Sequence, residues 1–228
     1  YYKRWCRVGS RMRIMCLSDT HTMHHKLDLS TLHGIDCVVH TGDFSNGDEL
    51  STDNFLCWFS DLPVKHKVFI AGNHDRHIQH NNDRFKRKVA LLGGIHYLED
   101  SGVDIEGIKF WGTPYVNQFY NWAFMLPEKE LSKVYKLIPK DTQVLLSHGP
   151  AQGILDFVPR IGGGHVGSLA LRNKVKRLKD LKYHIFGHIH CGAGKEVVIT
   201  KTNMYTAVNA SVLDDDYRWV NQPIVIEI

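Results

Sequence analysis

The chain has no long hydrophobic run, little net charge and no evident set of paired cysteines. None of its apolar runs approaches the ~20 consecutive apolar residues of a membrane-spanning helix, so we expect no contact with a membrane. The net charge is only +4 over 228 residues, which allows an anionic substrate without indicating nucleic acid as a partner. The five cysteines show no paired spacing, and we therefore expect a reducing, cytoplasmic setting rather than a disulfide framework.

The sequence also lacks internal repeats, low-complexity segments and linkers rich in Pro, Gly or Ser. Residues 1–11 are basic and contain no apolar run of the kind that a secretory signal needs. Because the chain begins with Tyr, we interpret residues 1–11 as a basic arm that is partly vector-derived. Residues 12–228 have an ordinary globular composition and are predicted to form a single domain.

What the sequence does contain is a recurring short apolar run, rich in Val and Ile, that ends in polar residues and glycine. Such runs are typical of buried strands. They lie at residues 13–17, 36–39, 67–70, 143–146 and 183–186. Helical patterns lie between them at residues 48–60, 83–92, 127–138 and 168–181. This alternation predicts an α/β fold with largely parallel strands at its centre.

A further group of segments resembles short strands joined by tight turns. These segments are residues 94–98, 103–106, 108–113, 196–200, 204–208 and 224–228. We expect them to build a second, mixed sheet. The predicted architecture is therefore two sheets with helices outside.

Histidine is the residue type in excess, with 15 copies, and several stand where the five core strands end. Polar side chains able to bind a metal follow every one of these strands. They are Asp19, His21, Asp43, Asn73, His74, His148, His188 and His190. Taken singly, each could instead cap a turn. Because ligands bind beyond the carboxyl ends of strands in α/β sheets, their joint occurrence predicts one shared site.

The residue types indicate which metal and how many ions. Mixed imidazole, carboxylate and amide ligands suit Mn, Fe or Zn, and we expect Mn first. Apart from His74, seven candidate ligands remain, which is too many for one zinc-like ion. Two ions that share one carboxylate would use them all, and Asp43 is the natural bridge. His74 is then spare, and the neighbouring Asp75 could orient it as an acid or a phosphate donor.

These residues resemble the motifs of the calcineurin-like metallophosphoesterases. The matching motifs are Asp19-Thr20-His21, Gly42-Asp43, Gly72-Asn73-His74-Asp75, His148-Gly149 and Gly187-His188-Ile189-His190. The blocks HTGDF, IAGNH, SHGP, DFVP and FGHIH more narrowly resemble the branch of metallophosphoesterase-domain-containing proteins. That branch is similar to class III cyclic-nucleotide phosphodiesterases.

The resemblance implies a four-layer α/β/β/α sandwich and a dinuclear site. By motif position, one ion would bind Asp19, His21, Asp43 and His190. The other would bind Asp43, Asn73, His148 and His188. The resemblance also implies that His74 is the catalytic histidine, and we group Asp75 with it. The fourth motif departs from the plain pattern by reading SHGP, which keeps the histidine.

Substrate contacts are expected from Asn73 and His74 and from two loops. Tyr115 belongs to an aromatic segment that continues to Trp122 and could stack a nucleobase. The alternative, which the sequence supports at least as well, is that this segment is a hydrophobic lid packed on its own helix. His165 ends a glycine-rich stretch, residues 160–165, before a helix whose N-terminus could hold an anion. A plain flexible loop is the alternative there.

Together these features predict a metal-dependent phosphodiesterase. Its substrate would be a small phosphoester or nucleotide, with cyclic nucleotides favoured, attacked by a metal-bridging hydroxide. The alternative from another class is a non-catalytic nucleotide-binding or scaffold protein on the same fold. A phosphomonoesterase or a nuclease would be a different hydrolase on that fold.

Overall fold

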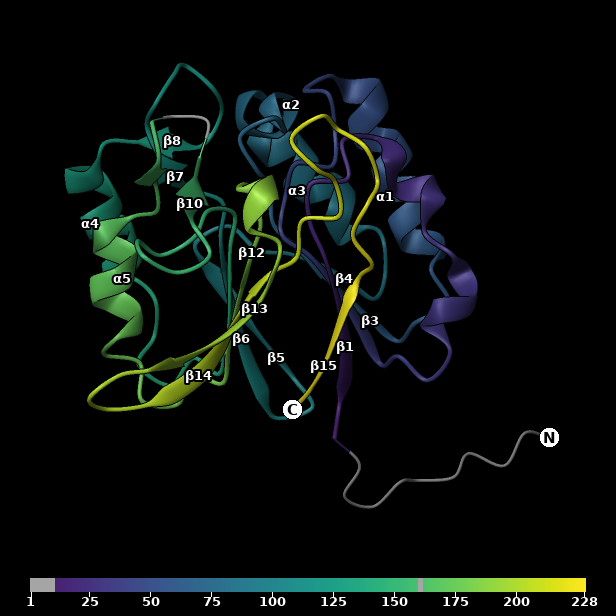
Figure 1. Ribbon diagram of the computed structural model, residues 1–228. Coiled ribbons are helices and arrows are strands. Elements are labelled where there is room, and N and C mark those ends of the chain that lie inside the picture. The colour runs from purple at the N-terminus through teal and green to yellow at the C-terminus, as the bar shows by residue number, and fades with distance from the viewer. Residues whose placement is uncertain (1–10, 160–161) are drawn as a thin grey trace.

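The computed structural model describes residues 11–159 and 162–228. The basic arm expected at residues 1–11 lies, apart from Arg11, outside the described residues. Two β-sheets pack face to face, and helices cover the outer face of each sheet (Figure 1). The two sheets with helices outside confirm the architecture predicted from the sequence pattern, and the four layers are the α/β/β/α sandwich that the family resemblance implies.

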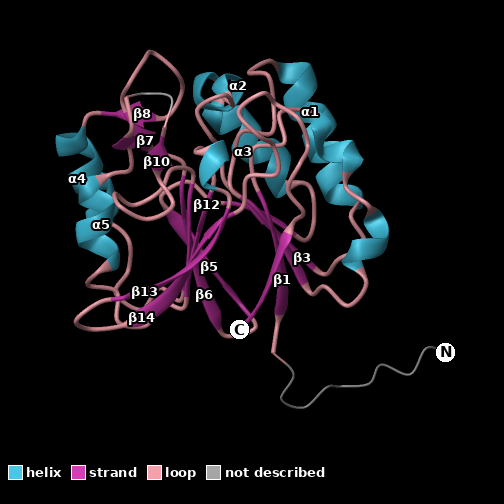
Figure 2. Ribbon diagram, in the orientation of Figure 1, coloured by secondary structure: helices cyan, strands magenta, loops and turns pink. Residues whose placement is uncertain are grey.

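The first sheet has the strand order β15-β1-β2-β3-β4. Its strands are β1 (Arg13–Leu17), β2 (Cys37–His40), β3 (His66–Phe69), β4 (Ile95–Tyr97) and β15 (Ile224–Glu227). Strands β1 to β4 are parallel, and β15 pairs antiparallel with β1. Helices α1 (Glu49–Asp61), α2 (Arg76–His80) and α3 (Asn82–Ala90) lie on its outer side (Figure 2).

The second sheet has the order β13-β14-β12-β9-β6-β5. Its strands are β5 (Ser101–Ile105), β6 (Ile108–Thr113), β9 (Val144–Ser147), β12 (Tyr183–Phe186), β13 (Gly194–Ile199) and β14 (Met204–Asn209). The four inner strands are parallel, and the edge strands β5 and β13 are antiparallel to their neighbours. Helices α4 (Glu128–Lys136) and α5 (Leu169–Val175) cover this sheet.

The distribution of strands between the sheets differs from our expectation. We expected the five core strands to share one sheet and the later segments to form the other. Instead, β9 and β12 belong to the second sheet, while β4 and β15 complete the first. The expectation was wrong because an apolar run identifies a buried strand without identifying the strand that pairs with it.

Apolar side chains from both sheets fill the space between them. Ile14 and Val39 of the first sheet lie in the same buried cluster as Leu146 and Ile185 of the second. Cys16 and Cys37 also lie in this layer, and burial, followed by Asp36, raises the pKa of Cys37 to about 12. The backbone N–H of His188, after β12, donates to the side chain of Asp19, after β1. The carboxyl ends of both sheets therefore meet at one end of the molecule.

Shorter elements complete the fold around this end. The helical turns are η1 (Met23–Lys26), η2 (Leu29–Leu32) and η3 (His190–Gly192). Two small ribbons pair β7 (Val116–Asn117) with β8 (Met125–Leu126) and β10 (Phe157–Val158) with β11 (Gly164–His165). No helix among the described residues is both long enough and apolar enough to cross a bilayer.

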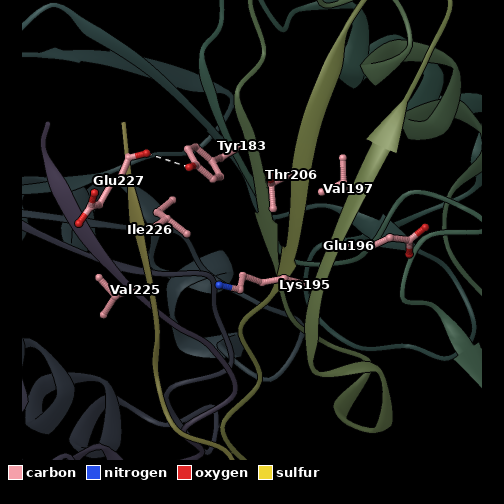
Figure 3. Close-up of a pocket in the computed structure, with 8 residues that line it drawn as sticks. All are labelled: Tyr183, Lys195, Glu196, Val197, Thr206, Val225, Ile226 and Glu227. Carbon is pink, nitrogen blue, oxygen red and sulfur yellow. Dashed lines mark hydrogen bonds between the residues drawn. The ribbon is translucent and has the colours of Figure 1, made fainter.

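A cleft of about 380 Å³ opens between β13, β14 and β15 (Figure 3). The hydroxyl of Tyr183 donates to the backbone carbonyl of Glu227 across it, at 2.8 Å, and so links the two sheets. Tyr183 begins β12, whereas His188 follows the other end of that strand. This cleft therefore lies away from the candidate ligands.

Candidate metal centre

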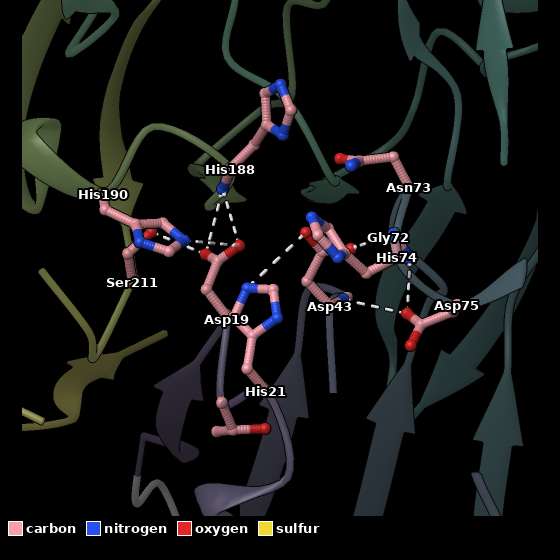
Figure 4. Close-up of polar contacts among 12 residues, drawn as sticks. Asp19, His21, Asp43, Gly72, Asn73, His74, Asp75, His188, His190 and Ser211 are labelled. Carbon is pink, nitrogen blue, oxygen red and sulfur yellow. Dashed lines mark hydrogen bonds and ion pairs between the residues drawn. The ribbon is translucent and has the colours of Figure 1, made fainter. Parts of the chain in front are cut away.

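The loops after five parallel strands bring the candidate ligands together (Figure 4). Strands β1, β2 and β3 of the first sheet lead to Asp19, Asp43 and Asn73, and β9 and β12 of the second lead to His148 and His188. Asp19, Asp43 and His188 adopt left-handed backbone conformations, with φ of 54°, 57° and 67°. Non-glycine residues seldom adopt this conformation, and such strain concentrates at functional sites.

The first group of ligand atoms comes from Asp19, His21 and His190, which lie within 4.8 Å of one another. Asp19 is fully buried. His190 Nδ1 lies 2.9 Å from the carbonyl of Asp214, to which it can donate, so that Nε2 faces Asp19 Oδ1 at 3.7 Å. His21 Nε2 is buried and has no hydrogen-bond partner among the described residues. Three donor atoms therefore point at one place, as a cation would require.

The second group comes from Asp43, His148 and His188, again within 4.8 Å. His148 Nδ1 lies 2.8 Å from the carbonyl of Thr41. Its Nε2 is therefore left to face Asp43 Oδ2 at 3.2 Å and Asn73 Oδ1 at 3.0 Å. This histidine uses the same arrangement as His190, in which a backbone carbonyl fixes the ring and the other nitrogen faces the site.

Asp43 lies between the two groups. Its Oδ2 is 3.2 Å from His148 Nε2 and 3.9 Å from His21 Nε2, and these histidines belong to different groups. Its Oδ1 accepts a hydrogen bond of 2.7 Å from the backbone N–H of His74. Asp43 is 2% exposed, so its carboxylate is shielded from solvent. This placement fits a carboxylate shared by two ions.

The electrostatics of the site favour bound positive charge. Burial opposes charge on His148 and His190, but Asp43 raises the pKa of His148 to about 9, and Asp19 raises that of His190 to about 9. His148 in turn holds the pKa of Asp43 well below its usual range, although burial acts in the opposite direction. Burial, with a contribution from His148, lowers the pKa of His188 to about 3. A neutral imidazole is the form that binds a metal.

The carboxylate of Asp75 has different surroundings from those we expected. The His74 ring lies edge-on to His21, with the ring centres 4.7 Å apart. It also belongs to a third group of possible ligands with His21 and Asp43. The carboxylate of Asp75 accepts hydrogen bonds from the backbone N–H groups of Gly72 and Asp43 and from Ser45. Among the described contacts of Asp75, none is with the His74 ring. Asp75 therefore holds the loop after β2 against the loop after β3 and does not orient the histidine.

Tyr115 does not meet the ligand groups. Its ring packs on Phe124 at 5.7 Å, and its carbonyl accepts from the hydroxyl of Tyr135. Two other aromatic residues of the same loop approach the site instead. Phe119 lies 5.6 Å from the His188 ring, and Trp122 lies 4.3 Å from the His74 ring. The aromatic segment thus reaches the candidate centre through these residues and not through Tyr115.

His165 lines a neighbouring cleft of about 430 Å³, together with Cys191 and Gly192 beyond the last motif. Its Nδ1 lies 2.5 Å from Asp156 Oδ1. The anion site expected at the start of the next helix is already occupied, because the side chain of Glu128 accepts from Ser168 and from the backbone of Ala170. Residues 160 and 161 of the glycine-rich stretch lie outside the described residues.

Two side chains at the site escaped the sequence analysis. The hydroxyl of Ser211 donates to Asp19 Oδ2 at 2.6 Å. The ring of Tyr217 lies 4.8 Å from His21 and 5.6 Å from His190, and this residue has φ of 59°. Both follow β14, where the chain returns to the site. No motif with a defined spacing includes these two residues. The local sign that this segment approaches the site is the polar residue Asn209, which ends β14.

The chain is similar to known proteins in both sequence and fold. The family model described as calcineurin-like phosphoesterase matches residues 12–192. Metallophosphoesterase domain-containing protein 1 of Homo sapiens is 34% identical, over 95% of this chain and 71% of the relative. UPF0046 protein C25E10.12 of Caenorhabditis elegans is 31% identical, over 96% and 82%. The crystal structure of TT1561 from Thermus thermophilus has the same fold, with a TM-score of 0.64, 13% identity and coverage of 96% and 99%.

Proposed function

This chain belongs to the calcineurin-like phosphoesterase family, and on that premise we propose that it is a phosphodiesterase with two divalent metal ions at its site. Membership makes it a metallophosphoesterase, and the structure contains candidate ligand groups for divalent ions. The ligands we assign are Asp19, His21, Asp43 and His190 for one ion, and Asp43, Asn73, His148 and His188 for the other.

The observation that carries this proposal is the position of Asp43 between two groups of ligand atoms. One oxygen of this buried carboxylate faces a histidine of each group, at 3.2 and 3.9 Å. A single-ion site would not need two sets of three donors, each within 4.8 Å. Two ions at these positions would activate water and neutralise charge on the phosphoryl oxygens. Their chemistry suits Mn, with Fe or Zn as alternatives.

The remaining side chains divide between binding and proton transfer. We assign to His74 the contact with the phosphoryl group or the leaving oxygen, because its half-buried ring lies beside His21 and outside the two assigned sets. Asn73 is a ligand that could also contact substrate. Phe119 is 53% exposed and lies beside His188. An exposed aromatic face at this position supports a substrate with a base, such as a cyclic nucleotide.

The setting of the protein is also part of the proposal. Among the described residues, Cys16, Cys37 and Cys57 are free cysteines, which supports a reducing, cytoplasmic environment. The cluster between the sheets joins residues from Met12 to Ile226, which supports a single domain over residues 12–228. His165 is kept as a candidate contact for a larger substrate, because its cleft borders the segment after His190.

The test is hydrolysis after chelation, with and without added Mn. We expect Mn to restore turnover of bis-p-nitrophenyl phosphate and of 2′,3′-cyclic AMP more than that of p-nitrophenyl phosphate. Asp43→Ala should lose both metal and activity. His74→Ala should keep its metal and lose about 10²–10⁴-fold in kcat on the cyclic nucleotide. His33→Ala, at an exposed histidine beside η2, is the matched control.

Each alternative has its own outcome. Preference for the monoester would replace the diesterase with a phosphatase. Tight AMP binding by metal-loaded protein that hydrolyses neither ester would support the non-catalytic binding protein. Full turnover by His74→Ala would refute the role of this histidine while leaving the metal centre in place.

A further inference from the structure

We propose that Trp122 is the positioning residue of His74, which it orients by packing rather than by a hydrogen bond. The inference rests on the function proposed above, because it concerns how the catalytic histidine of that reaction is held. It assigns a role to a residue of the aromatic loop between β7 and β8.

A histidine that transfers a proton or binds a phosphoryl oxygen must be held in one orientation, and a carboxylate commonly does this. Asp75 is not available for that task, because Gly72, Asp43 and Ser45 occupy its carboxylate. Among the hydrogen bonds of the described residues, none involves a ring nitrogen of His74. The described ring contacts of His74 are with Trp122 and His21.

Trp122 supplies that contact. Its indole lies 4.3 Å from the His74 ring, centre to centre, with an angle of 41° between the planes. The guanidinium of Arg76 lies over the same indole, at 4.3 Å from the ring centre. A cation over an aromatic face is attracted to it. Trp122 is thus held by a residue that follows His74 by only two positions.

The backbone of the aromatic loop is joined to the turn that carries His74. The N–H of Ala123 donates to the carbonyl of Asn73 at 3.1 Å, and the N–H of Phe124 donates to Gln79 Oε1 at 3.1 Å. Phe124 is 1% exposed and lies in the core under the first sheet's helices. The two acceptors, Asn73 and Gln79, precede and follow His74 in the sequence. The loop that carries Trp122 is therefore tied to the segment that carries His74.

Loss of the indole leaves His74 with the edge contact to His21 as its remaining ring contact among the described residues. The imidazole could then rotate while the metal ligands stay in place. A small misplacement of a reacting group can lower the rate about 10²-fold. We therefore expect Trp122→Leu to lower kcat without releasing metal.

The experiment is a double-mutant cycle on the metal-loaded protein with 2′,3′-cyclic AMP. We expect Trp122→Leu to lower kcat about 10–100-fold, with KM changed by less than about threefold and metal content equal to that of the parent. Trp122→Phe keeps an aromatic face and should retain most of the activity. In a His74→Asn background, Trp122→Leu should have almost no further effect, because its action passes through His74.

Two controls separate positioning from a general loss of structure. Trp58→Leu makes the same chemical change at a tryptophan of α1 that packs on His24 and Phe55, and it should leave kcat within about twofold. Arg76→Met removes the charge over the indole and should give a smaller loss than Trp122→Leu. Arg87→Met, on α3, is its control.

A second readout does not depend on turnover. The indole face should shift the NMR signals of the His74 ring, which are identified by their loss in His74→Asn. Trp122→Leu should move these signals toward those of a free histidine, and Trp58→Leu should not. Unchanged His74 signals in Trp122→Leu would overturn the proposal.

The kinetic outcomes are equally decisive. Wild-type kcat in Trp122→Leu, or a loss that adds in full to that of His74→Asn, would also overturn the positioning role. Absence of phosphoester turnover in the parent protein would instead refute the proposed function. The two failures are therefore distinguishable in one set of measurements.

Discussion

At the scale of single residues, two glycines let the loops approach the carboxylates. A Cβ atom on Gly187 would overlap Ser18 Oγ and Asp19 Oδ2, and one on Gly72 would overlap Asp43 Oδ1. Neither glycine has a positive φ, so the space, and not the backbone conformation, requires them. Because these positions carry no side chain, the backbone of each glycine can lie directly against a buried aspartate of a neighbouring loop.

Gly187→Ala should therefore weaken metal binding. The added methyl displaces Asp19 or the end of β12, and overpacking of this kind lowers the free energy of unfolding by about 1–3 kcal/mol. We expect a weaker Mn affinity in a titration and a lower midpoint in urea. Gly93→Ala, where nothing lies within 4 Å of the new Cβ, is the control. Parent-like Mn affinity in Gly187→Ala would contradict this account.

Site residues that directly follow a strand can be predicted from the sequence. Site residues that contact them from distant parts of the chain cannot. The ends of the apolar runs predict which side chains gather, and the structure places them in groups, although metal binding by them stays a prediction. Ser211 reaches Asp19 across 192 positions, and no spacing rule covers such a contact. Asp75 was misjudged because adjacency to His74 in sequence does not determine where its carboxylate points.

At the scale of elements, hydrophobic pattern and caps locate most boundaries. The strands at Arg13–Leu17, Ile108–Thr113 and Tyr183–Phe186 occur at the residues predicted. Helix α5 ends at Val175 rather than at residue 181. The next turn instead has hydrogen bonds between residues three apart, such as that from the N–H of Leu178 to the carbonyl of Val175. Helix α2 was not predicted, since five residues are too few to show a periodic pattern.

The start of α1 provides a test of stability at this scale. Asp48 caps the helix by accepting from Ser51, through the backbone N–H at 2.8 Å and the hydroxyl at 2.9 Å. Asp48→Ala should lower the free energy of unfolding by about 1 kcal/mol at pH 7. Asp48→Asn keeps an acceptor and should lower it less. Activity should be unchanged in both variants.

The effect of Asp48 should also depend on pH. The hydrogen bonds from the backbone and hydroxyl of Ser51 lower the pKa of Asp48. A carboxyl whose pKa is lower in the folded state stabilises the fold above its unfolded pKa of ~3.9 and loses this effect as the pH falls. The difference between parent and Asp48→Ala in urea denaturation should therefore shrink below about pH 4. A difference that stays constant to pH 2.5 would exclude the charged cap.

At the scale of the whole molecule, the candidate centre joins the two sheets. Asp19, Asp43 and Asn73 follow strands of one sheet, and His148 and His188 follow strands of the other. Sequence alone could not show this division, because each run predicts a strand and not its sheet. The consequence is that anything bound by both sets of candidate ligands also holds the sheets together.

Metal should accordingly stabilise the entire fold. Asp19 and Asp43 are buried carboxylates, and a buried charge is unfavourable unless it is compensated. Ions that bind the folded state alone add RT ln(1 + [L]/Kd), which is about 2.7 kcal/mol at 100 times Kd. For a chain of this size this corresponds to a rise in Tm of about 5–11 °C. We expect that rise when Mn is added to chelated protein, measured by calorimetry. Asp43→Ala should show almost no rise, because it removes the ligand that we propose the two ions share. An equal rise in that variant would place the stabilising ions elsewhere.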